Sequence, residues 1–125
     1  LFLGADKPPE KDLGWLTEHP VIQELFFRHT QERARHGLKP LRLNKHMCLV
    51  AQRHAQWQAR NGFYQHSGNG YAENIHTSVI LPAHAVRDWV NSPSHYANML
   101  GGYQEIGCGY DYTASSGSRW VVIFR

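Results

Sequence analysis

The chain has 125 residues, which suits a single domain and leaves too little material for two independent cores. Apolar residues make up 42% of it and charged residues 18%, with a formal net charge of +3, so a disordered or fibrous chain is excluded. Apolar runs such as residues 79–81 are far shorter than a membrane span, so no transmembrane helix is expected.

The first 19 residues show no hydrophobic period. They contain Pro8, Pro9 and Gly14 among six charges, which predicts an N-terminal arm or linker. Trp15 and Leu16 are candidates for anchoring this arm to the body of the protein. The predicted domain therefore covers residues 20–125.

Helical periodicity begins after residue 19. Apolar side chains recur there at the i, i+3, i+4 spacing of a helix with one buried face. The predicted helices run from Pro20 to about Arg35, from the N-cap Asn44 to Arg60, from Pro82 past Trp89, and from Pro93, with Ser92 as N-cap, past Asn98. Gly37 and Gly62 stand where the first two helices should end.

The last quarter of the chain changes period. Residues 105–112 and 118–124 are rich in aromatic and β-branched residues, and a short segment with Ser116 and Gly117 separates them. This pattern predicts a β-hairpin. Helices followed by a hairpin indicate an α+β fold, in which a small antiparallel sheet is flanked by helices.

Several common catalytic motifs are absent. No His-Glu-x-x-His zinc-protease helix, Gly-x-Ser-x-Gly elbow or P-loop occurs, and Gly68 and Gly70 lack the third glycine of a dinucleotide-binding loop. Many enzyme classes are thereby excluded, although others remain open.

The densest polar clusters are residues 65–76 and 92–98, and their order along the chain resembles the CAP superfamily (cysteine-rich secretory proteins, antigen 5 and pathogenesis-related proteins), in particular its small bacterial SCP-like branch. The matching segments are 35–41, 51–55, His66-Ser67, Glu73-Asn74-Ile75, Trp89 with 92–95, 106–109 and 120–124. They follow the family's order and cover about residues 20 to 125.

The resemblance implies an α-β-α sandwich with a central cleft, in which two histidines and acidic residues can hold a divalent metal ion, often zinc. Carried over by motif, the metal ligands are His66 and His95, and the first acid is Glu73, which would ligate the metal or orient a bound water. Many family members have a second glutamate just after the helix tryptophan. Here Trp89 is followed by Val90, Asn91 and Ser92, so that acid is missing.

These observations lead to one main functional hypothesis and two alternatives. The main hypothesis is a secreted or cell-envelope-associated binding domain, expected to be a monomer, whose cleft can hold Zn²⁺ without demonstrated catalysis. The first alternative is a metal-assisted peptidase or esterase with Glu73 as catalytic base. The second is a module that binds lipid or an anionic polymer. The ligand itself stays open, and nucleic acid is not expected.

The nine histidines do not all point to a metal site. For His66, His95 and Glu73, a purely structural role is the alternative to a shared site. His76 is a spare ligand or, preferably, a surface-loop residue. We expect His29 and His54 to be packing residues, His84 to form an exposed pair with Asp88, and His19, His36 and His46 to be solvated near helix ends.

Positive charge is concentrated in one part of the chain, which also contains one of its two cysteines. Residues 28–60 carry eight Lys or Arg and one acid, giving 8 − 1 = +7, which we interpret as solvated helix faces rather than a face for anionic lipid, polymer or nucleic acid. No aromatic platform is apparent among these charges. Cys48 and Cys108 both project inward, and their positions are compatible with one disulfide or with two buried thiols.

Overall fold

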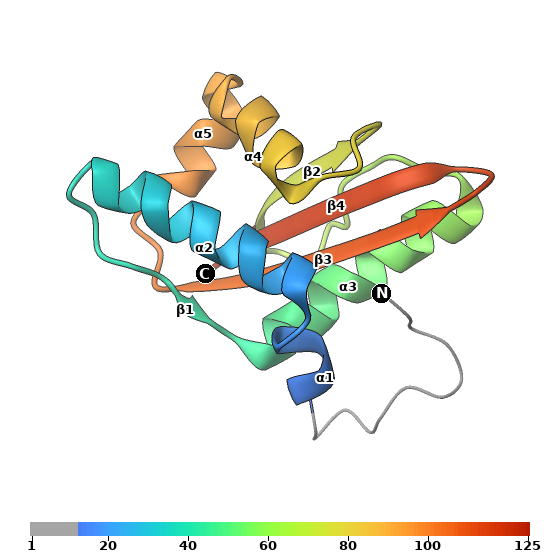
Figure 1. Ribbon diagram of the computed structural model, residues 1–125, viewed down its shortest axis with the longest axis horizontal. Coiled ribbons are helices and arrows are strands. Elements are labelled where there is room, and N and C mark those ends of the chain that lie inside the picture. The colour runs from blue at the N-terminus through green and yellow to red at the C-terminus, as the bar shows by residue number, and fades with distance from the viewer. Residues whose placement is uncertain (1–12) are drawn as a thin grey trace.

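The computed structural model describes residues 13–125 (Figure 1). Its elements, in chain order, are α1 (Gly14–Thr17), α2 (Pro20–Arg35), β1 (Arg42–Leu43), α3 (Lys45–Asn61), β2 (Ala72–Thr77), α4 (Pro82–Val90), α5 (Pro93–Met99), β3 (Glu105–Thr113) and β4 (Gly117–Phe124). Residues 1–12, most of the predicted arm, lie outside the described residues. The end of that segment forms α1, where Leu16 is fully buried.

The four strands form one sheet in the order β1-β3-β4-β2. The predicted hairpin is confirmed, because β3 and β4 pair antiparallel with Cys108 opposite Val122. Strand β2 pairs antiparallel with β4, and the two-residue β1 adds a parallel edge beside β3. The sequence analysis did not anticipate β2, because its polar residues hide the period-2 pattern of a half-buried strand.

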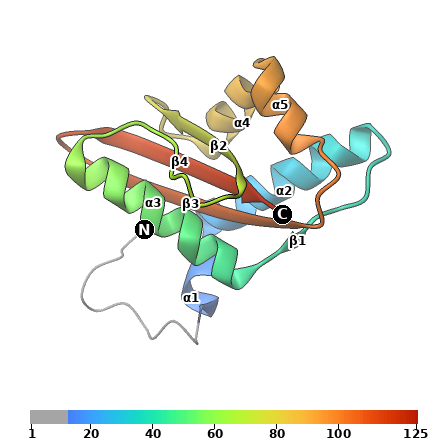
Figure 2. The same cartoon turned by 180° about the vertical axis from the view of Figure 1, so that it is seen from behind.

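Strand β4 lies at the centre of the fold and is buried on both faces. Val121 and Ile123 pack with Met47, Ala51 and Ala55 of α3. Trp120, Val122 and Phe124 face the larger cluster formed with α2 and α4. Figures 1 and 2 show α3 on one side of the sheet and α2, α4 and α5 on the other, which is the expected α-β-α sandwich. Each large apolar side chain buried here contributes about 1.5–3 kcal/mol.

Helix α3 lies unusually close to β3. A Cβ atom added at Gly109 would lie 2.5 Å from the carbonyl carbon of Ala51, and one at Gly107 would lie 2.5 Å from the carbonyl oxygen of Met47. Any side chain at these positions would collide with the helix backbone. Glycine is therefore required for the contact between helix and strand.

The two cysteines meet at this same contact. The backbone amide of Cys108 donates to Sγ of Cys48 over 3.4 Å, and both residues are buried free thiols. Burial raises the pKa of Cys48 to about 11, so this thiol stays protonated at neutral pH. Of the two alternatives that the sequence allowed, the structure contains the pair of thiols.

The helix ends follow the sequence signals. Asn44 caps α3 by accepting a hydrogen bond from the Met47 amide over 2.9 Å, and Gly62 ends the helix in a left-handed conformation at φ +70°. Ser92 precedes α5 as predicted, but its hydroxyl contacts a histidine instead of capping the helix. No helix in the described part of the chain is both long and apolar enough to cross a membrane.

Candidate functional site

Glu73 organises the predicted site from strand β2. Its side chain is nearly buried, and both carboxylate oxygens accept hydrogen bonds from the loop that precedes the strand. Oε1 accepts from Nδ1 of His66 over 2.7 Å and from the Ser67 amide over 2.9 Å, while Oε2 accepts from the Ser67 hydroxyl over 2.6 Å. Three short bonds to one carboxylate fix this loop against the sheet.

This arrangement determines the tautomer of His66. An ionised carboxylate can only accept, so the ring proton of a neutral His66 is on Nδ1. The lone pair is then on Nε2, and the side chain is 64% exposed. Histidines that bind a metal ion through one ring nitrogen usually donate the other ring N–H to a carboxylate in this way.

His95 reaches the same region from α5. Its Nδ1 lies 2.8 Å from the hydroxyl of Ser92, which leaves Nε2 as the nitrogen that the ring can offer to a ligand. The ring is partly buried. Because a hydroxyl can either donate or accept, this contact orients the ring without fixing its tautomer.

Asn74 holds α5 next to Glu73. Its buried amide donates to the His95 carbonyl over 2.9 Å, and its own carbonyl oxygen accepts from Asn98 over 2.9 Å. The sequence placed Asn74 in a family motif but indicated no role for it. Its position directly after Glu73 was the available signal, because neighbouring strand residues point to opposite faces and can link two layers.

The pKa of His95 is lowered, first by burial and then by the positive charges of His66 and His76. A lowered pKa keeps His95 neutral at physiological pH, and the neutral ring is the form that binds a metal ion.

His76 differs from its prediction. It lies in strand β2 rather than in a surface loop, and its Nε2 donates to the carboxylate of Asp88 on α4 over 2.8 Å. The predicted pair between His84 and Asp88 is wrong, because Asp88 instead accepts from His76 and from Arg87. The β2–α4 pairing was not predictable from the sequence without knowing that residues 72–77 form a strand.

His29 and His54 are packing residues, as expected. His29 is almost fully buried between Trp89 and Phe124, and its Nδ1 donates to the Leu25 carbonyl over 2.7 Å. Burial lowers its pKa to about 4. His54 is half-buried and stacks on Trp57.

Of the three other predicted surface histidines, His19 and His36 have specific contacts. His19 caps α2, because its Nδ1 accepts from the Val21 amide over 3.2 Å. Nε2 of His36 lies 2.7 Å from the Tyr96 hydroxyl. His46 is exposed near the start of α3, as expected.

The donor set of the site suits a metal ion but is incomplete. Imidazole nitrogens are good ligands for zinc, and each of the two rings is oriented by a second contact. Within residues 13–125, however, no group of three or more His, Cys, Asp or Glu side chains is arranged to hold a metal ion. The described residues therefore form no metal site with three protein ligands, and a metal ion at His66 and His95 would have to take its further ligands from elsewhere.

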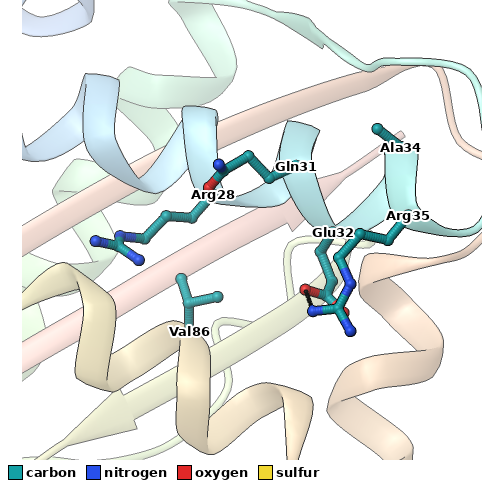
Figure 3. Close-up of a pocket in the computed structure, with 6 residues that line it drawn as sticks. All are labelled: Arg28, Gln31, Glu32, Ala34, Arg35 and Val86. Carbon is teal, nitrogen blue, oxygen red and sulfur yellow. Dashed lines mark hydrogen bonds and ion pairs between the residues drawn. The ribbon is translucent and has the colours of Figure 1, made fainter.

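A separate pocket of about 620 Å³ lies between α2 and α4 (Figure 3). Its lining residues are Arg28, Gln31, Glu32, Ala34, Arg35 and Val86, none of which is a predicted site residue. The two arginines are paired with Glu24 and Glu32 at 2.8 and 3.4 Å. Glu32 also accepts a 2.5 Å hydrogen bond from Tyr96 of α5. The pocket is thus polar, with its charges largely balanced.

Comparison with known proteins identifies relatives over most of the chain. The sequence model of the CAP family, described as the cysteine-rich secretory protein family, matches residues 26–124. The protein YkwD of Bacillus subtilis is 28% identical over 111 residues, which cover 74% of this chain and 42% of YkwD. The secreted protein RBT4 of Candida albicans is 30% identical over 78 residues, covering 62% of this chain and 22% of RBT4. The chain thus spans less than half the length of these two relatives.

A solved structure supports the same fold. An outer surface protein of Borrelia burgdorferi superposes with a TM-score of 0.75, and the match covers 83% of this chain and 90% of the Borrelia chain. The two sequences are only 20% identical. At this identity the likeness concerns the arrangement of helices and strands alone.

Proposed function

This chain belongs to the CAP family, and on that premise we propose that it is an extracytoplasmic binding domain in which His66 and His95 hold a divalent metal ion, with zinc the expected one. The proposal is carried by one observation. In each imidazole, Nδ1 is engaged by a neighbouring oxygen, so Nε2 is the nitrogen that the ring can offer to a metal ion.

The names of similar proteins support an extracytoplasmic location. One sequence relative is described as secreted, and one structural neighbour as an outer surface protein. The buried thiols do not conflict with an oxidising compartment, because both are shielded from solvent and remain protonated.

Glu73 is assigned a positioning role. Both of its oxygens are occupied by His66 and Ser67, so binding a metal or taking a proton from water would first require these bonds to break. This favours a binding domain over the metal-assisted hydrolase, in which Glu73 would be the general base. A bound zinc ion would supply Lewis acidity, which polarises a carbonyl or lowers the pKa of a coordinated water.

Two protein ligands should give modest affinity. Structural zinc sites usually have four protein ligands and catalytic sites three. Here the remaining positions would be open to water or to a donor atom from a ligand. Binding should also weaken as the pH falls, since protonation of either imidazole removes its lone pair.

Calorimetric titration with zinc tests the proposal. We expect wild type to bind about one equivalent near neutral pH, and His66→Ala and His95→Ala each to weaken binding at least about tenfold. Glu73→Gln should weaken it about 10–100-fold, the usual effect of removing the hydrogen-bond acceptor of a metal-binding histidine. His46→Ala, which changes an exposed histidine on α3, is the matched control and should bind like wild type.

Equal binding by wild type and the His66→Ala/His95→Ala double variant would exclude the site. An effect of His46→Ala as large as that of either site variant would show that zinc binds to surface histidines in general.

A further inference from the structure

The outward side of α3 carries an aromatic platform, formed by His54, Trp57, Phe63 and Tyr64. The rings of His54 and Trp57 stack with centroids 5.8 Å apart, and those of Trp57 and Phe63 stack at 5.2 Å. Trp57 is 42% exposed and Phe63 is 48% exposed. Half-exposed rings gathered at one place on a surface often mark a binding site.

The platform is held rigidly by contacts from three directions. His54 donates through Nε2 to the Gln65 carbonyl over 2.7 Å, and the Tyr64 hydroxyl donates to the Ile75 carbonyl over 3.2 Å. Arg119 of β4 donates to the Phe63 carbonyl over 2.7 Å. The left-handed Gly62 turns the chain back so that Phe63 reaches Trp57. A preorganised surface loses little entropy when it binds a rigid partner.

Cations surround the platform. His46, Arg53, Trp57 and Arg60 follow one another at i+7, i+4 and i+3 along α3, so these exposed residues form a single stripe. Residues 33–72 contain seven Lys or Arg and no Asp or Glu. Asp111 of β3 interacts with Arg60. The charge therefore complements an anionic partner.

We propose that this stripe and platform bind a linear acidic polysaccharide. The negatively charged face of an aromatic ring attracts the C–H groups on the flat side of a pyranose, and guanidinium groups bind carboxylates along the chain. Figure 2 shows α3 running along the outside of the sheet, so an extended chain can follow the helix. This is a second site, separate from the two histidines and independent of any metal.

Two other anionic partners fit the surface less well. A membrane would require a broader apolar face, but the stripe offers one tryptophan among arginines and no exposed aliphatic side chain. Single-stranded nucleic acid needs several large rings spaced along the strand, whereas Trp57 is the one large ring among the four residues of the stripe.

The test is calorimetric titration with a polygalacturonate decasaccharide in the presence of a chelator. We expect wild type to bind, with an affinity that falls as salt is added. The affinity of Trp57→Ala for the decasaccharide should fall about tenfold or more, and that of Arg53→Gln should fall several-fold. Phe27→Ala is the matched control, because Phe27 is 58% exposed on α2, and it should bind within about twofold of wild type.

The same titrations with a neutral cellohexaose, with phosphatidylglycerol vesicles and with a dT12 oligonucleotide identify the partner class. Retained affinity in Trp57→Ala, or an equal loss in Phe27→Ala, would overturn the proposal. Trp57-dependent binding to vesicles or to dT12 in place of the decasaccharide would also overturn it. Since chelator is present throughout, these outcomes do not depend on whether zinc binds at His66 and His95.

Discussion

Two regions of the sheet are built in opposite ways. One is the contact of β3 with α3, and the other is the edge of the sheet at β2. At the first, glycines bring two backbones together and leave no room for a side chain. At the second, α5 and the loop before β2 are held by hydrogen bonds from Glu73, Asn74 and Ser92. Close packing cannot absorb a change in volume, whereas polar contacts at a partly exposed edge can rearrange. The sheet is therefore packed tightly against α3 at β3, while the candidate site lies at its more polar β2 edge.

The largest effect is expected for Gly109→Ala. The new methyl group would lie 2.5 Å from the carbonyl carbon of Ala51, so α3 would have to move away from the sheet. We expect a loss of about 3 kcal/mol or more in the free energy of unfolding, measured by denaturant titration. Gly102→Ala is the control, since that methyl group meets nothing within 4 Å, and it should change stability by less than about 0.5 kcal/mol. Similar losses for both variants would refute the close contact.

His29 provides the next largest effect, which depends on pH. Its pKa is about 4 in the folded protein and about 6.5 when unfolded, so the unfolded chain binds the proton more readily between these values. Its contribution to stability is complete above pH 6.5 and falls by about 3 kcal/mol as the pH approaches 4. His29→Phe keeps a ring between Trp89 and Phe124 and should flatten this part of the curve of unfolding free energy against pH. An unchanged slope in that variant would assign the acid sensitivity to other groups.

The smallest effect should come from the site itself. His66 is largely exposed, and Glu73 keeps its two hydrogen bonds from Ser67 when His66 is removed. His66→Ala should therefore lower the free energy of unfolding by less than about 1 kcal/mol, again measured in denaturant. A loss comparable with that of Gly109→Ala would mean that the β2 edge supports the fold as strongly as α3 does.

The sequence predicted the elements whose signals are local. Asn44, Gly62 and the prolines of the helix starts marked helix ends correctly, and the run from Trp120 to Phe124 indicated a buried strand. Strand β2 was missed because its partner β4 is more than 40 residues away and its own residues are largely polar. The hydrogen bond between His76 and Asp88 was missed for the same reason, because it requires β2 to lie beside α4.

The sequence suggested residues for the candidate site but not the hydrogen bonds that hold them. A family resemblance suggested His66, Glu73 and His95. In the structure Glu73 accepts from His66, and its neighbour Asn74 donates to the His95 carbonyl. The resemblance did not reveal that Ser67 occupies the second oxygen of Glu73 or that Asn74 anchors α5. Such hydrogen bonds depend on the direction of side chains at the edge of a sheet. Residue spacing in one sequence does not give these directions. The aromatic platform was missed for a similar reason, since Phe63 meets Trp57 only through the turn at Gly62.

The central claim, that two histidines oriented by their neighbours form the metal site, is tested most directly by diffraction from zinc-soaked crystals at the zinc absorption edge. We predict one anomalous peak about 2.0–2.1 Å from Nε2 of both His66 and His95, with Glu73 still bound to Nδ1 of His66. A peak on the Glu73 carboxylate without both histidines, a peak only elsewhere, or no peak at saturating zinc would contradict the account.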